Sequence, residues 1–299
     1  LEISDVQANA LAETSFIFNA GDSADVLLDS AGATQLSTSL KDLQKLNIDA
    51  VGVMGDGLTV DLGAGGLNDF ANLGAGGLPS FTDSADITLA LNDAGQVDLS
   101  NLTTLTACLD NLATAGIDQI SVEALGVDAL GEFDIFALES ALNTANINGG
   151  PALGLQISDA QANVLADGIM AFADDDSQVL VDAGEGTHLS TSLKELQKLN
   201  IDTVMVGGES LTVDLGEGSI NGMSLDANGL PTFTDSADVT LALNGAGQVD
   251  LGDLTTLTAG LGDLEAAGID QISVEALGTT GLTGDALLGD FDIFALESA

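Results

Sequence analysis

The sequence predicts an α/β protein built from two tandem copies of one repeat, each made of strand–helix–strand crossover units in a solenoid-like stack. Three observations lead to this fold class. The second half repeats the first block by block, extended segments alternate with leucines at helical spacing, and glycines follow the helical stretches. Because a strand, a helix and a second strand form a crossover between parallel neighbours, we expect parallel sheets.

The duplication is visible as blocks that return in the same order. Leu1–Asn9, which reads LEISDVQAN, returns as LQISDAQAN at Leu155–Asn163. Leu36–Asp49 returns with a single change at Leu189–Asp202, where Glu195 replaces an aspartate. Identity this close indicates a tandem duplication within a repeat array.

The block boundaries predict the domain organisation. Phe133–Ala141 returns as Phe291–Ala299. We therefore expect a first repeat domain over residues 1–141, a linker over 142–154 and a second repeat domain over 155–299. Because the second closing block coincides with residue 299, a third copy could follow, which favours a segment of a longer array.

Each half is predicted to open with a helix, Asp5–Glu13 in the first copy. Extended segments beginning near Ser23 and Ser84 then lead into leucine-spaced helices. The leucines of the first helix are Leu36, Leu40, Leu43 and Leu46, and those of the second are Leu99, Leu102, Leu105, Leu109 and Leu112. Gly116 is placed to stop the second helix before the extended segment Ile117–Val122. A further extended segment, Leu58–Leu62, lies in a glycine-rich stretch.

The charge balance excludes several partner classes. Against 47 acidic residues stand four lysines, which gives a net charge of -43. A nucleic acid backbone or an anionic membrane surface needs a basic stripe, and this chain has none. The lysines, Lys41 with Lys45 and Lys194 with Lys198, are expected on solvated helix faces. The charge must be screened by metal cations or by high salt.

The sequence contains few of the cysteine, histidine and aromatic side chains on which many catalytic and binding sites depend. Cys108 is the only cysteine and its counterpart is Gly260, so we expect a buried apolar residue. His188 is the only histidine and corresponds to Gln35. No Gly-x-Ser-x-Gly motif is present, and there is no Trp or Tyr on which a sugar ring could stack. We therefore predict that the chain is not an enzyme, with an acidic hydrolase as a distant alternative.

Carboxylates recur where the predicted strands begin. Asp-Ser-Ala-Asp precedes three strands, an altered acidic run precedes a fourth, and an Ile-Asp pair precedes each crossover partner. If partner strands are neighbours, these oxygens converge at one sheet edge and could bind calcium. The alternative is that they cap turns through backbone N–H groups. The candidate calcium ligands are Asp22, Asp25, Asp49, Asp83, Asp86, Asp118, Asp174, Asp176, Asp202, Asp235, Asp238 and Asp270.

Near-identical long repeats, the absence of Arg and the abundance of Asp, Gly, Thr and Leu resemble the repeat regions of giant secreted bacterial adhesins and of surface-layer or filament proteins. This resemblance implies an extracellular, calcium-stabilised structural module whose partners are other copies or adjacent repeats. The alternative is an adhesin module that binds a carbohydrate or a surface protein through its glycine-rich loops. Halophilic adaptation could also account for the charge without specific cation sites.

Overall fold

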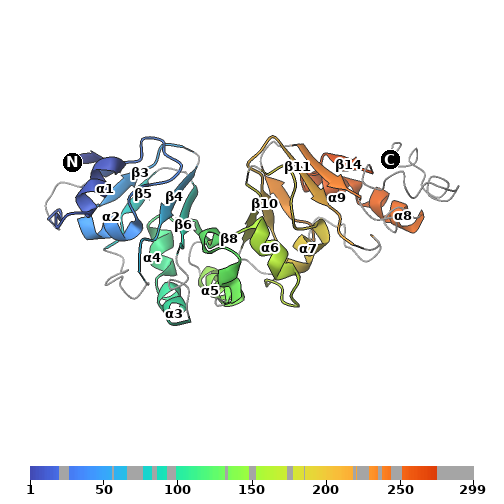
Figure 1. Cartoon of the computed structure of the whole chain (residues 1–299), viewed down its shortest axis with the longest axis horizontal. Coiled ribbons are helices and arrows are strands. Elements are labelled where there is room, and N and C mark those ends of the chain that lie inside the picture. The colour runs from blue at the N-terminus through green and yellow to red at the C-terminus, as the bar shows by residue number, and fades with distance from the viewer. Residues whose placement is uncertain are drawn as a thin grey trace. The chain divides into compact units, whose positions relative to one another are not determined.

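The structure is a computed structural model with two compact units (Figure 1). The first unit comprises Leu1–Ile157 with Ala173–Gln178, and the second comprises Ser158–Phe172 with Val179–Ala299. The residues that the structure describes are 1–19, 27–55, 57–65, 77–82, 86–92, 99–131, 134–147, 153–173, 178–184, 186–217, 220, 229–234, 238–243 and 251–274.

The first unit contains two parallel strand arrays. The first array runs β1 (Glu2–Ser4), β2 (Leu27–Asp29), β3 (Ala50–Gly52) and β5 (Ser80–Thr82). The second runs β4 (Gly57–Asp61), β6 (Asp86–Ala90), β7 (Gln119–Ser121) and β8 (Gly154–Ser158). Every pairing in both arrays is parallel.

The second unit repeats this arrangement. One array runs β9 (Val179–Asp182), β10 (Thr203–Met205) and β12 (Thr232–Thr234). The other runs β11 (Ser210–Asp214), β13 (Asp238–Ala242) and β14 (Gln271–Ser273). The predicted α/β class with parallel sheets is confirmed, and this strand order is compatible with a solenoid. The predicted crossover partners are neighbours: β2 with β3, β6 with β7, β9 with β10 and β13 with β14.

The helix that opens each copy is present where the sequence predicts it. It is α1 (Asp5–Ala12) in the first copy and α6 (Asp159–Ala166) in the second. Both begin with a capping box, in which the side chain of Ser4 or Ser158 accepts from the N–H of the glutamine three residues on. The glutamine side chain accepts from the backbone N–H of the serine, so both orphan donors are satisfied.

The next helix is shorter than predicted, because the leucine spacing indicated a helix that begins at Leu36. It is α2 (Leu40–Leu46) in the first copy and α7 (Leu193–Leu199) in the second. Leu36 precedes α2 in extended chain and donates its N–H to Thr59 O at 2.9 Å, yet its side chain is 3% exposed. A leucine at helical spacing therefore reaches the core here without being helical. Asn47 ends α2 in the left-handed region at φ 55°.

The second leucine-spaced segment, Leu99–Leu112, forms two helices, so the prediction of one continuous helix is wrong. The first copy has α3 (Leu99–Thr106) and α4 (Leu109–Thr114), and the second has α8 (Leu251–Ala259) and α9 (Leu261–Ala266). The N–H groups of Asn111 and Leu112 both bond Cys108 O, because the helix restarts there. Gly116 follows α4 at φ 94°, as predicted.

A 13-residue helix, α5 (Ile135–Ile147), lies at the end of the first copy and follows two short 3₁₀ turns, Glu123–Leu125 and Asp128–Gly131. Its last residues occupy the start of the expected linker over 142–154, and β8 begins at Gly154. Sequence reasoning missed this helix, although Ile135, Leu138 and Leu142 recur at helical spacing and are buried.

The core is aliphatic, as the composition predicts. Leucines from the helices and valines or isoleucines from the strands are buried, for example Leu43, Val51, Leu196 and Val204, each 0% exposed. Burial of these side chains provides the main stabilising free energy of each unit. Among the helices of the described residues, none is long and apolar enough to cross a membrane.

Candidate functional site

Three of the aspartates that precede crossover partner strands bond to the neighbouring strand through both the main chain and the side chain. Asp118 donates its N–H to Ile87 O, and its Oδ2 accepts the N–H of Ile87, both at 2.9 Å. Its own carbonyl accepts from Gly154 N on the opposite side at 2.9 Å. One residue therefore bonds to β6 through its side chain and main chain, and to β8 through its carbonyl.

The second copy uses its aspartates in the same way. Asp202 Oδ2 accepts the N–H of Val179 at 2.7 Å, and Asp270 Oδ2 accepts that of Val239 at 2.9 Å. The carbonyl of Asp202 also accepts from Thr232 N at 2.8 Å. Because a carboxylate is a strong acceptor, each aspartate supplies a bond that the end of the ladder would otherwise lack.

Six predicted calcium ligands lie within the described residues. Asp49, Asp86, Asp118, Asp202, Asp238 and Asp270 are all exposed at the beginning of strands. Parallel pairing brings Asp86 and Asp118 to one edge of the first unit, and Asp238 and Asp270 to one edge of the second. The other six lie outside the described residues: Asp22, Asp25, Asp83, Asp174, Asp176 and Asp235.

The described part of the chain supports the capping role for three of these side chains. Asp118, Asp202 and Asp270 already hold backbone N–H groups through Oδ2. Among the described residues, no three acidic, histidine or cysteine side chains are grouped as a metal site. Calcium therefore stays a prediction that depends on further ligands from the neighbouring acidic runs.

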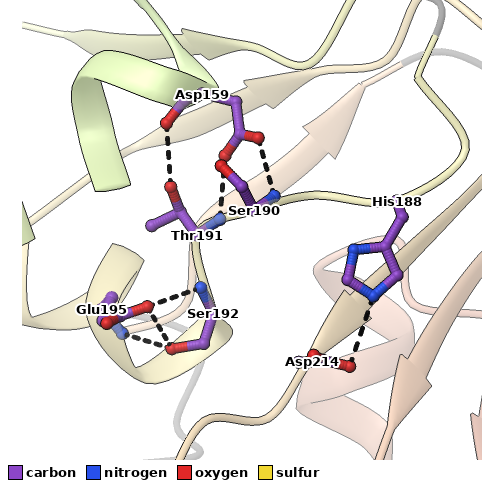
Figure 2. A network of polar contacts seen from close by, with 7 residues as sticks. All are labelled: Asp159, His188, Ser190, Thr191, Ser192, Glu195 and Asp214. Atoms are coloured by element: carbon purple, nitrogen blue, oxygen red, sulfur yellow. Dashed lines mark hydrogen bonds and ion pairs between the residues drawn. The ribbon is translucent and has the colours of Figure 1, made fainter. Parts of the chain in front are cut away.

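A second carboxylate, which sequence reasoning missed, joins the opening helix to the next one. Asp159 at the start of α6 accepts from Ser190 N at 2.7 Å and Thr191 N at 2.9 Å (Figure 2). Its carbonyl accepts from the Thr191 hydroxyl at 3.0 Å. Glu195 closes the N-terminus of α7 by accepting from the backbone and hydroxyl of Ser192. The sequence feature that could have indicated this contact is Ser-Thr-Ser before the helix, which occurs in both copies.

The matching carboxylate of the first copy is Asp5. Its two oxygens accept from Ser37 N at 2.8 Å, the Ser37 hydroxyl at 2.7 Å and Thr38 N at 3.0 Å. Partial burial acts to raise the pKa of Asp5, but the hydrogen bonds from Ser37 and Thr38 outweigh it. The pKa of Asp5 is therefore lowered. The ionised form fixes α1 against the segment that leads into α2.

The sequence also singled out His188 and Cys108. His188 is 56% exposed, and its Nε2 lies 3.6 Å from Asp214 Oδ1 (Figure 2). The residue is solvated and precedes the helix, as expected. Cys108 is half-buried rather than buried, because it occupies the break between α3 and α4, and partial burial raises the pKa of its thiol.

The lysines lie on helix faces, but each ammonium group also binds main-chain carbonyls. Lys45 Nζ donates to Ala12 O at 2.5 Å, and Lys198 Nζ donates to Ala166 O at 2.5 Å and Gly168 O at 2.7 Å. These carbonyls lie at the C-terminal ends of α1 and α6, where a positive charge is favourable. Lys194 similarly donates to Glu217 O at 2.8 Å.

Replacing Lys198 with methionine, which keeps the aliphatic stem, should lower the free energy of unfolding by about 1–2 kcal/mol. The cause is loss of two hydrogen bonds and of the charge at the end of α6. Chemical denaturation followed by circular dichroism measures the change. Lys198→Arg keeps the charge and should lose less than half as much, so equal losses for the two variants would contradict the capping role.

The comparisons with known proteins returned no match. Neither protein-family models, nor curated proteins, nor solved structures resemble this chain detectably.

Proposed function

We propose that the chain is a structural extracellular repeat module of a bacterial surface or filament protein, which self-associates and is stabilised by calcium or other cations. The observation that carries this proposal is the pairing of β8 with β7. The strand that opens the second copy thereby continues the ladder that closes the first, with Ile120 opposite Leu155. A repeat joined to the next through main-chain bonds suits a load-bearing array.

The charge supports the cation part of the proposal. A net charge of -43 opposes the compact state, and each of the four lysines donates to a backbone carbonyl. Strand-start aspartates such as Asp86 and Asp238 are exposed at the sheet edge. Cations bound there would screen the repulsion between neighbouring acids.

Calcium should raise the thermal unfolding temperature of the chain at moderate salt, and EDTA should reverse the rise. Binding only to the folded state at 100 times Kd adds about 2.7 kcal/mol. Differential scanning calorimetry with calcium, EDTA and sodium chloride series measures the effect. Unchanged unfolding in EDTA would refute cation dependence, and a need for molar sodium chloride without a calcium response would indicate halophilic adaptation.

The double variant Asp86→Asn with Asp238→Asn tests whether calcium acts at the strand-start aspartates. It removes two strand-start charges but leaves the bonds of Asp118 and Asp270 intact, so it should lower the calcium-induced rise without lowering the unfolding temperature in EDTA. Glu13→Gln with Glu265→Gln is the matched control, because it removes two exposed charges elsewhere. If both pairs respond to calcium alike, screening is general and the strand-start site is wrong.

A further inference from the structure

The junction between β7 and β8 shows how one copy receives the next. Gly154 N donates to Asp118 O at 2.9 Å, and Val122 N donates to Gln156 O at 3.0 Å. The parallel register places Ser121 opposite Gln156. In this ladder the main-chain groups of Gln156 face β7.

The matching strand β1, which differs from β8 at Glu2 in place of Gln156, lies at the outer edge of the first copy without such a partner strand among the described residues. Leu155 and Ile157 are 0% exposed in β8, whereas the matching Leu1 is 65% exposed and Ile3 is half-buried in β1. Glu2 is exposed, whereas the matching Gln156 is 7% exposed. β1 pairs with β2 on one side only, so the main-chain groups of Glu2 face outward.

The far end of the second copy presents the complementary edge. β14 corresponds to β7 and pairs with β13, while no described strand lies along its other edge. Ile120 and Val122 are 0% exposed, whereas the matching Ile272 and Val274 are half-buried. Each end of the described chain therefore carries half of the β7–β8 junction.

We propose that the outer edge of β14 in one copy pairs in parallel with the outer edge of β1 in a second copy, in the register of β7 and β8. This inference rests on the proposed self-association. Ile272 lies opposite Leu1, and Ser273 lies opposite Glu2. Glu2 N–H donates to Ile272 O, and Glu2 O accepts from Val274 N–H. Because the two edges differ, the contact is head-to-tail, so it links successive copies into a ring or an open filament.

One substitution between the copies weakens this junction relative to the internal one. At the internal junction the Gln156 amide donates to Glu123 Oε1 at 3.3 Å. Position 2 holds glutamate, which as a carboxylate cannot donate, and the sequence counterpart of Glu123 is Glu275. The contact between separate copies therefore lacks this hydrogen bond, and Glu2→Gln strengthens the contact by supplying the missing donor.

Sedimentation velocity of the 299-residue chain over a concentration series tests the contact. Glu2→Gln should lower the dissociation constant about fivefold, by adding one hydrogen bond. Glu2→Pro removes the outward N–H and should abolish association. Ile169→Asp is the control, since Ile169 is 98% exposed and lies outside both edges. Circular dichroism and the unfolding temperature verify that each variant is folded.

Two results would overturn the inference and can be told apart. If Glu2→Pro associates like the parent while Ile169→Asp does not, self-association stands but uses another surface. If the parent and Glu2→Gln both stay monomeric at every concentration, with and without calcium, the self-association in the proposed function fails as well.

The register is tested by disulfide trapping between two chains. Both chains carry Cys108→Gly, which removes the native cysteine and introduces the residue that the second copy has at the matching position, Gly260. One chain carries Glu2→Cys and the other Ser273→Cys, and paired residues of neighbouring strands lie within reach of a disulfide. Mixed oxidation should give the cross-linked heterodimer. Gln271→Cys in place of Ser273→Cys shifts the register by two residues and should cross-link several times less. Equal yields would overturn the proposed register.

Discussion

Gly216→Ala should lower the free energy of unfolding by about 2–4 kcal/mol. Gly216 has φ 98°, which a side chain rarely adopts. An added Cβ would also lie 2.6 Å from Ser192 Oγ and 3.0 Å from Ser192 Cβ. Ser192 cannot move away cheaply, because its hydroxyl accepts from Glu195 N–H as the cap of α7 and donates to Glu195 Oε2 at 2.7 Å. Strain and overpacking therefore act together.

Gly262→Ala is the matched control for this prediction. Gly262 lies within α9 and has open space around the position of a new Cβ. Alanine there should raise stability by about 0.5–1 kcal/mol, because it restricts the unfolded chain and favours a helix. Urea denaturation of both variants measures the two changes. Changes of the same sign and size would contradict the steric account of Gly216.

Asp5→Ala should lower the free energy of unfolding by about 2–3 kcal/mol near neutral pH, because three donors of Ser37 and Thr38 lose their acceptor. The pKa of Asp5 is lowered in the folded state. Its contribution is therefore present above the unfolded-state pKa and is lost as pH falls through the folded-state pKa. The stability difference between the parent and the variant should shrink over this acidic range.

The variants Asp5→Asn and Glu13→Ala separate the pH-dependent contribution of the Asp5 carboxylate from the effect of protonating the other acidic residues. Asparagine places an amide NH₂ against backbone donors, so Asp5→Asn should also lose stability and show the same narrowing at low pH. Glu13 is exposed at the end of α1, and its replacement should change stability by less than about 0.5 kcal/mol. Parallel pH profiles for the parent and Asp5→Asn would show that the carboxylate of Asp5 has no special role.

The sequence by itself determined the duplication, the parallel α/β class and the crossover partners. These follow from block identity and from apolar periodicity, both local properties. Leu43 and Leu46 could be assigned to a buried helix face, and Gly116 to a helix end, because spacing and the preference of glycine for positive φ are encoded locally. The aspartates at strand starts were also identifiable, because they recur in place.

Only the tertiary structure decided what those aspartates and the lysines bind. Asp118 accepts a backbone N–H from a strand 31 residues away in sequence, and Lys198 donates to the end of a helix 32 residues away. Neither partner has a side-chain pattern, because the groups that are bound are main-chain atoms present at every residue. For the same reason, the open edges of β1 and β14 are recognisable only from the structure, in which their counterparts β8 and β7 are paired with each other and buried.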